Sequence, residues 1–455
     1  MQANQLRQFE TEPIGRLLLR YSIPAIVGNI VMATYNIIDR IFIGQGVGPE
    51  AIAGLGITFP VMNISTAFGV LVGVGGSSRV SILLGEKNYK MAQRVLGNAL
   101  VLTIGIALAY IACFAVFIDD FLYMFGADEQ TLPYAHDYLI YLLPGFLFIN
   151  LSYSFNNYIR SSGYPRKAMI TMFIGAVVNV ILDPIFIFGL NMGIKGAAIA
   201  TDIAMGVSMV WVMAHLSQEK HHLHFTRGIY KLQWGIVASI FSIGAAPFLI
   251  NITHSFVGAL INHSLLRWGG YMAIAAASIF NTFGQILVMV IIGLCQGMQP
   301  IVGYNYGARI FSRLRRTYTL TAAAASAICI VGTAIALFCP TLIARAFTAD
   351  DTLIDVTDNA LHIAMSMFWL VGFQIVSTNF FQSIGKAWKS IFLSLTRQIL
   401  FLIPLVLTVP LWLGLDGVWA SFAISDVIST IITAAMIVAQ FRYFTRLTTS
   451  PAPST

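Results

Sequence analysis

The feature that most limits the fold of this chain is a series of long apolar segments separated by short polar ones. The chain is 57% hydrophobic and only 10% charged, and its mean hydropathy is +0.79. A helix of about 20 apolar residues crosses the hydrocarbon layer of a bilayer. The segments therefore predict an all-α integral membrane protein with twelve transmembrane helices. They lie at roughly 17–43, 53–84, 95–118, 132–159, 168–189, 193–215, 236–262, 273–304, 317–342, 357–384, 390–411 and 415–441.

The charged residues give an independent test of this topology. Most of the 26 Lys and Arg fall in alternate loops, and most loop acids fall in the other set. Basic loops mark the cytoplasmic side of membrane proteins, which predicts that both termini are cytoplasmic. The net charge of +7 then reflects topology. The lipid bilayer is the expected partner, and nothing indicates nucleic-acid binding.

An internal repeat relates the two halves of the chain. At one constant offset, Gly75, Gly85, Asn157 and Ser161 fall on Gly297, Gly307, Asn379 and Ser383. Each half has six spans, an even number, so the repeat is parallel and its axis lies along the membrane normal. We expect two six-helix lobes around a central cavity. The predicted boundaries are an N-terminal lobe at 1–216, a cytoplasmic linker at 217–234, a C-terminal lobe at 235–445 and a disordered tail at 446–455.

Polar groups gather in three spans of the N-terminal lobe. Asp39 lies in the apolar run from Ser22 to Gly44, where an acid is costly and indicates a functional site. Tyr35 precedes Asp39 by one turn, and Asn179 shares a helix face with Asp183 four residues later. Thr201 lies at a similar depth, because a helix rises about 1.5 Å per residue. These five residues form the predicted coupling site.

Two kinds of chemistry fit such a group. Two poorly solvated carboxyl groups can take up and release a proton as a pair. The same oxygens at Asp39, Asn179, Asp183 and Thr201 also suit Na⁺. The coupling ion, H⁺ or Na⁺, stays open, and no other cofactor is expected.

Several other residues are weaker candidates for the coupling site. Asp202 and Asn36 are secondary coupling candidates, although Asp202 points away from the face of Thr201. Asp183 precedes Pro184, and the alternative is a local hydrogen bond where the fifth span frays. Asp426, in the twelfth span, faces an unknown direction and either takes part in coupling or holds its lobe together.

The substrate cavity is predicted to lie deeper than the coupling site. Met32, Met172 and Met205 continue the same helix faces inward, and Asn251 and His254 are polar members of the seventh span. Methionine suits promiscuous binding surfaces, with core packing as the alternative.

Two further features of the chain carry predictions of their own. Pro24 removes a backbone hydrogen bond in the first span and is the predicted hinge. The linker histidines, His221, His222 and His224, indicate a solvated segment, with metal binding as the alternative.

The tract NIIDRIFIGQGVGPE and the six-plus-six arrangement resemble the multidrug and toxic compound extrusion (MATE) family, in its DinF-like, MepA-like branch. The resemblance implies a monomeric antiporter of a bacterial cell (inner) membrane. It exports small amphipathic, often cationic organic compounds in exchange for H⁺ or Na⁺ by alternating access. The family's first-span Asp and Tyr, fifth-span Asn and Asp and sixth-span Thr match Asp39, Tyr35, Asn179, Asp183 and Thr201. The seventh span lacks the Glu of the NorM-like branch, which places coupling in the N-terminal lobe.

Three other function classes fit the sequence less well. A lipid-linked precursor flippase of related architecture needs a basic cavity, and only Arg79 and Arg397 lie within the predicted spans. A membrane-embedded enzyme is not supported, because no HExxH, GxSxG or GxxxxGK[ST] motif is present. A pore is disfavoured, since the two lobes carry different polar groups.

Overall fold

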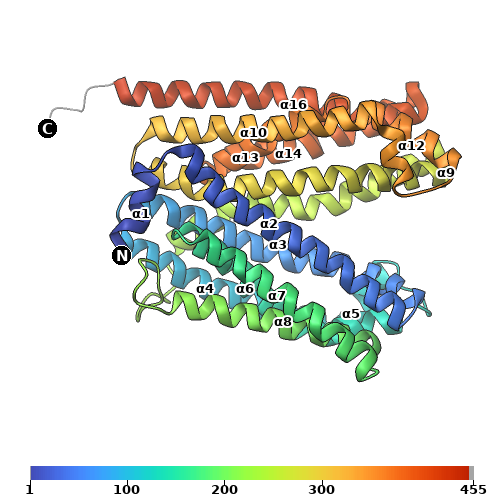
Figure 1. Cartoon of the computed structure of the whole chain (residues 1–455), viewed down its shortest axis with the longest axis horizontal. Coiled ribbons are helices and arrows are strands. Elements are labelled where there is room, and N and C mark those ends of the chain that lie inside the picture. The colour runs from blue at the N-terminus through green and yellow to red at the C-terminus, as the bar shows by residue number, and fades with distance from the viewer. Residues whose placement is uncertain (1, 450–455) are drawn as a thin grey trace.

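The computed structural model describes residues 2–449, which are almost entirely helical (Figure 1). The elements in chain order are α1 (Gln2–Thr11), α2 (Ile14–Gly46), α3 (Pro49–Gly85), α4 (Tyr89–Val116), α5 (Ile118–Met124), α6 (Leu132–Ser161), α7 (Pro165–Pro184), η1 (Ile185–Gly189), α8 (Gly193–Leu216), α9 (Trp234–Gly307), α10 (Phe311–Phe338), α11 (Pro340–Arg345), α12 (Asp351–Ala364), η2 (Phe368–Leu370), α13 (Val371–Ser383), α14 (Ala387–Leu395), η3 (Thr396–Leu402), α15 (Ile403–Thr408) and α16 (Pro410–Thr449). Of the short elements, η1 and η3 are π-helical and η2 is a 3₁₀-helix.

The described helices account for the twelve predicted spans. Ten are long and apolar enough to cross a membrane, and α12 with α13 forms an eleventh span bent by 50°. The 74 residues of α9 are too long for one crossing, and its backbone leaves the helical region at Gly270. This break divides α9 into two legs that serve as the seventh and eighth spans.

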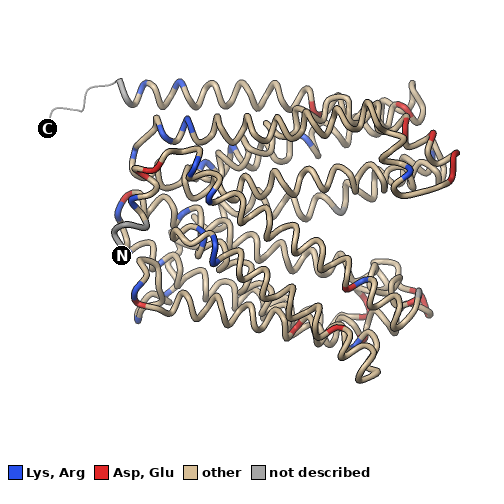
Figure 2. Tube along the Cα trace, in the orientation of Figure 1, with Lys and Arg blue, Asp and Glu red and all other residues tan. Residues whose placement is uncertain are grey.

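Charge divides the bundle into two ends, which we call the basic end and the acidic end (Figure 2). Lys and Arg concentrate at the basic end, where the N-terminus lies, and many of the acids lie at the opposite end. This separation agrees with the alternation of charged loops in the sequence.

Glycines of the repeat form paired contacts between the two lobes. A Cβ atom on Gly85 would collide with the carbonyl oxygen of Tyr304, and one on Gly307 would collide with that of Ile82. The offset of the repeat carries each member of one contact onto its counterpart in the other. The same holds for Gly75 against Gly244 and for Gly297 against Ser22. Such reciprocal contacts are those of a two-fold axis, so the predicted internal repeat is confirmed.

Contacts between the lobes lie toward the basic end. Gln299 of α9 donates hydrogen bonds to Ser77 (3.1 Å) and Ser78 (2.7 Å) of α3. Phe68 and Phe248 pack across the interface with ring centroids 5.2 Å apart. The ribbons of the two lobes diverge toward the acidic end (Figure 1). The basic end is therefore closed.

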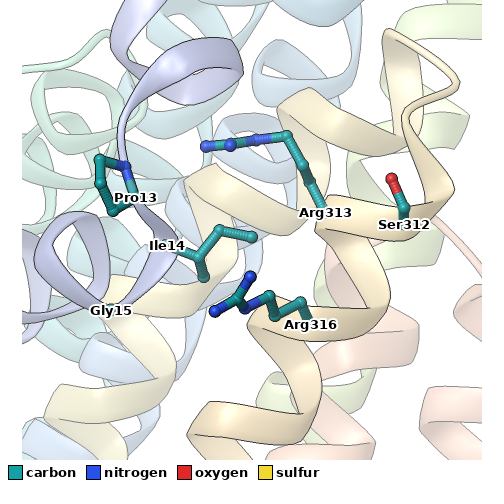
Figure 3. Close-up of a pocket in the computed structure, with 6 residues that line it drawn as sticks. All are labelled: Pro13, Ile14, Gly15, Ser312, Arg313 and Arg316. Carbon is teal, nitrogen blue, oxygen red and sulfur yellow. The ribbon is translucent and has the colours of Figure 1, made fainter.

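The N-terminal helix α1 bridges the lobes, although the sequence placed it in the N-terminal lobe alone. The buried ring of Phe9 lies 5.4 Å from that of Tyr21 in α2 and 5.1 Å from that of Tyr304 in α9. Arg313 of α10 donates to the carbonyl oxygens of Phe9 (3.0 Å) and Glu12 (2.6 Å). Figure 3 shows Arg313 and Arg316 facing the start of α2 across a pocket of about 230 Å³.

The linker at 217–234 packs in part against the N-terminal lobe, while more than half of its residues are exposed, as expected for a solvated segment. His221, Leu223 and Ile229 are buried. Asn98 of α4 donates to the carbonyl oxygen of Ile229 at 3.2 Å. Among the described residues, no group of three or more His, Cys, Asp or Glu is arranged to hold a metal ion.

The predicted disordered tail overlaps the last helix. The helix α16 continues to Thr449, so the first four residues of the predicted tail are helical. Residues 450–455 lie outside the described part of the chain.

Candidate functional site

The predicted polar residues of the N-terminal lobe meet in one buried cluster, which we call the acid site (Tyr35, Asp39, Asn179, Asp183 and Thr201). Asp39 of α2 and Asp183 of α7 form a side-chain hydrogen bond with each other. Asp183 is fully buried and Asp39 is 8% exposed. Two ionised carboxylates that face each other repel. A hydrogen bond between the two carboxyl groups therefore requires a proton on one of them. The pair is therefore built to hold a proton.

Asn179 joins the acid site to α8. Its Nδ2 atom donates to Oδ1 of Asp183 and to Oγ1 of Thr201, each at 3.2 Å. The four-residue spacing of Asn179 and Asp183 predicts this shared face. After Pro184 the helix changes to the π-helix η1, so the hydrogen-bond pattern is altered directly beyond the acid site.

Two buried tyrosines lie near the carboxyl groups of the acid site, and the sequence indicated only one of them. Tyr35 is buried and interacts electrostatically with Asp39 and Asp183. Tyr138 of α6 is also buried and interacts electrostatically with Asp39, Tyr35 and Asp183. No spacing rule connects α6 with the other spans. The available signal was a tyrosine in an apolar span, whose hydroxyl needs a partner when buried.

Three oxygen atoms of the acid site have acceptor capacity to spare. Asp39 Oδ1, Asn179 Oδ1 and Asp183 Oδ2 are buried, and apart from the contact between the two carboxyl groups none of them accepts a hydrogen bond from another described residue. Leaving such atoms unpaired costs about 1–3 kcal/mol each. A proton, or a hard cation that prefers oxygen ligands, would satisfy them.

The secondary candidates lie outside the acid site. Asn36 is exposed and donates to the carbonyl oxygen of Met32 in its own helix at 2.8 Å. Asp202 faces α6, where a Cβ atom on Gly145 would collide with its carboxyl oxygen. Asp202 still interacts electrostatically with Tyr138, which places it beside the acid site rather than in it.

An apolar cluster lies next to the acid site. Tyr35, Ala176 and Met205 are buried together, and Met32 packs against them. Met172 fills the space beside Gly28, where its sulfur would collide with any Cβ atom. Met32 and Met205 therefore pack close to Tyr35, whereas Met172 packs against Gly28 of the helix that carries Tyr35. Met32 and Met172 are only partly buried.

The first span links the acid site to the interface between the lobes. The helix α2 is continuous through Pro24, which is buried and causes no break. Near Pro24, backbone atoms of Ser22 and Ile26 lie against Gly297 and Gly293 of α9. One helix therefore carries Asp39 at one end and contacts the C-terminal lobe near the other.

The candidate residues of the seventh span differ in their surroundings. Asn251 donates to the carbonyl oxygen of Pro247 at 2.8 Å within its own helix. This bond turns its amide toward the backbone. His254 is exposed and interacts electrostatically with Arg397. His254 therefore remains the better candidate for the cavity.

Asp426, whose direction the sequence left open, pairs with Arg397. The Nε atom of Arg397 donates to Oδ1 of Asp426 at 2.6 Å. Gln374 of α13 donates to the backbone carbonyl oxygen of Asp426 at 2.6 Å. Both charged residues were visible in the sequence as charges within spans, but their pairing was not predicted.

Comparisons with known proteins agree with this architecture. The chain is 27% identical over 428 residues to the multidrug export protein MepA of Staphylococcus haemolyticus (strain JCSC1435), and the match covers 94% of each chain. The fold resembles an outward-facing multidrug resistance MATE family transporter of the MOP superfamily, with a TM-score of 0.91, 24% identity and 98% and 99% coverage. It also resembles a crystal structure of MATE in the bent conformation, with a TM-score of 0.93, 24% identity and 99% and 100% coverage.

The model of the MatE family matches residues 24–185 and again residues 247–408. The two matches have the same length, and their displacement along the chain agrees with the offset of the internal repeat. These relatives are transporters, which favours transport over catalysis. The chain therefore belongs to the MatE family of multi-pass membrane transporters.

Proposed function

We propose that this protein exports amphipathic, often cationic organic compounds from a bacterial cell in exchange for protons. The observation that carries the proposal is the buried, hydrogen-bonded pair of Asp39 and Asp183. The printed name of the staphylococcal relative, a multidrug export protein, supports the substrate class. The basic end is cytoplasmic by the positive-inside rule, and the transporter works as a monomer in the cell (inner) membrane.

Two features of the acid site favour a proton over Na⁺. Asp39 and Asp183 interact directly, so one proton can be shared between them. The amide nitrogen of Asn179 donates to Asp183 and Thr201, so it occupies oxygen lone pairs that a cation would need. Na⁺ remains the alternative ion, with Asp39, Asn179, Asp183 and Thr201 as its ligands.

The helix α2 offers a route from ion binding to movement of the lobes. Loading a proton from the outside removes charge from Asp39, which changes how α2 packs against α7. Because Ser22 and Ile26 of the same helix lie against Gly297 and Gly293, a shift of α2 changes the closed interface. Substrate then leaves outward, and the proton leaves inward when the basic end opens. This cycle is alternating access between two lobes.

The flippase alternative is less well supported by the cavity charges. Arg397 is paired with Asp426 through Nε, so it offers a ligand only its terminal nitrogens and no net charge of the pair. Arg79 lines a separate pocket of about 320 Å³ together with Lys386 and Glu86. A lipid diphosphate needs several unbalanced cations in the central cavity, and this pattern does not supply them.

Dye transport by inside-out vesicles tests the proposal. Vesicles that contain the full chain should accumulate a cationic dye when their lumen is acidified, and Asp39→Asn should abolish the uptake. Asp128→Asn is the matched control, because Asp128 lies in an exposed loop where it accepts hydrogen bonds from Thr131. If only a Na⁺ gradient drives uptake, the coupling ion is Na⁺ rather than a proton. Full activity of Asp39→Asn under either gradient would end the proposal.

A further inference from the structure

The ion pair between Arg397 and Asp426 is buried on one side only. The side chain of Asp426 is 3% exposed, whereas that of Arg397 is 30% exposed. Arg397 uses Nε for this contact, and its two terminal nitrogens have no hydrogen-bond partner among the described residues. If an ion pair in a membrane protein has only a structural role, both of its charged groups are expected to be buried. Here the carboxylate of Asp426 is buried, whereas the terminal nitrogens of Arg397 have no acceptor in the described part of the chain.

Arg397 lies among residues of the C-terminal lobe. It interacts electrostatically with His254 of α9 and Cys329 of α10. Ser425 of α16 donates to the backbone carbonyl oxygen of Arg397 at 2.7 Å. Three helices of the same lobe thus contribute residues near Arg397, and the exposed His254 is one of these residues.

The local backbone is specialised at this point. Arg397 lies in the π-helix η3, and such single-turn elements occur often at functional sites. The repeat supplies a comparison, because an offset of 222 residues aligns Gly175 with Arg397 and an offset of 221 residues aligns Met205 with Asp426. A Cβ atom on Gly175 would lie against Oγ of Ser208 and, at 3.9 Å, Cε of Met205. The ion pair therefore occupies the place where the N-terminal lobe has an uncharged contact, so the repeat itself does not require it.

Aromatic side chains line the same region. Phe422 precedes Asp426 by one helical turn and packs against Phe280 of α9, with ring centroids 5.3 Å apart. Trp419 also contacts Phe280, at 6.4 Å. Apolar walls with a few convergent polar groups are typical of small-molecule sites.

We infer that Arg397 is a specificity-determining residue that binds a carboxylate, or a similar acceptor group, of the transported compound. The inference rests on the proposed export function and names a substrate class, zwitterionic amphipathic compounds. Their cationic group is attracted by the acids of the N-terminal lobe, and their carboxylate accepts hydrogen bonds from the terminal nitrogens of Arg397. A guanidinium group is well shaped for this contact, because its donors match the two oxygens of a carboxylate.

A matched pair of dyes tests the inference. Rhodamine 110 has a free carboxylate where rhodamine 123 has a methyl ester, so the first is zwitterionic and the second is cationic. Proton-driven uptake of both dyes is measured in vesicles that contain the full chain. The variant is the double substitution Arg397→Gln and Asp426→Asn, which removes both charges and leaves no unpaired acid. Arg79→Gln is the matched control, since Arg79 lines a different pocket.

The double variant should transport rhodamine 123 within about twofold of the unmodified protein and rhodamine 110 roughly tenfold more slowly, which corresponds to one charge-assisted hydrogen bond. Arg79→Gln should change the two rates equally. Retained transport of rhodamine 123 also shows that the double variant is folded. The inference is overturned if both dyes slow equally, if neither slows, or if the unmodified protein transports only rhodamine 123. In that last case export stands, whereas transport of neither dye would remove the proposed function itself.

Discussion

The two lobes share one fold but not one chemistry. The N-terminal lobe holds Asp39 and Asp183 against each other, and among the described residues no basic side chain is hydrogen-bonded to either. The C-terminal lobe holds Asp426 against Arg397. A carboxyl pair changes its charge when it gains or loses a proton, whereas an ion pair is already balanced. The difference shows how the two halves of a duplicated fold can divide their roles: one half changes its charge by protonation, and the other half can recognise the substrate.

The largest expected effect comes from the acid site. Asp183→Asn should abolish proton-driven dye transport, because it leaves Asp39 without a carboxyl partner with which to share a proton. Thermal unfolding in detergent should change little, since an amide fits the same space. Normal transport by a folded Asp183→Asn variant would contradict the assignment of coupling to the carboxyl pair of the N-terminal lobe.

A single substitution in the C-terminal lobe should act on stability rather than on coupling. Arg397→Met leaves Asp426 buried without a counter-charge, a situation that costs about 3–5 kcal/mol. Thermal unfolding in detergent should reveal the loss. The double substitution Arg397→Met and Asp426→Leu should recover most of it, because no buried charge remains. Equal stability of the single and double variants would show that Asp426 does not depend on Arg397.

The repeat predicts that two glycine substitutions have equal effects. Gly85→Val and Gly307→Val each force a side chain against the backbone of the opposite lobe, at Tyr304 and Ile82 respectively. Overpacking of this kind typically costs about 1–3 kcal/mol, which favours opening of the basic end. The measurement is the rate at which a thiol reagent labels Ser78→Cys, in a background whose four native cysteines are replaced.

Ser78 is buried beside Gln299 in the closed interface, so faster labelling reports opening. Both glycine variants should label faster, and by similar factors. Acceleration by only one of them would show that the two contacts are not equivalent.

The smallest expected effect concerns the linker and pH. Burial, with Lys167 and Lys220 nearby, lowers the pKa of His221 to about 4, from about 6.5 in an unfolded chain. The docked linker binds fewer protons than the free one between these values. Its stability should be complete above about pH 6.5 and should fall as the pH decreases toward 4. Protection factors for hydrogen exchange of residues 217–233, compared at pH 7 and pH 5, measure this, because they are corrected for the pH dependence of the chemical exchange rate. His221→Gln should reduce the difference.

Sequence patterns predicted the features that are determined within one helix or by the internal repeat. The length of the apolar segments indicated the spans, and the spacing of Asn179 and Asp183 indicated their shared face. Contacts that depend on packing between distant helices were not predicted. Arg397 and Asp426 lie 29 residues apart on different spans, and nothing in their spacing indicates contact. Asp202 shows the same limit, because its partner surface at Gly145 lies on another helix.

The bridging position of α1 has a consequence for biosynthesis. Phe9 and Glu12 leave the ribosome before Tyr304 and Arg313, which hold them and lie about 300 residues later in the chain. At translation rates of about 5–20 residues per second, the helix α1 waits at least roughly 15 seconds for its binding surface. Its docking therefore reports that the second lobe has been inserted.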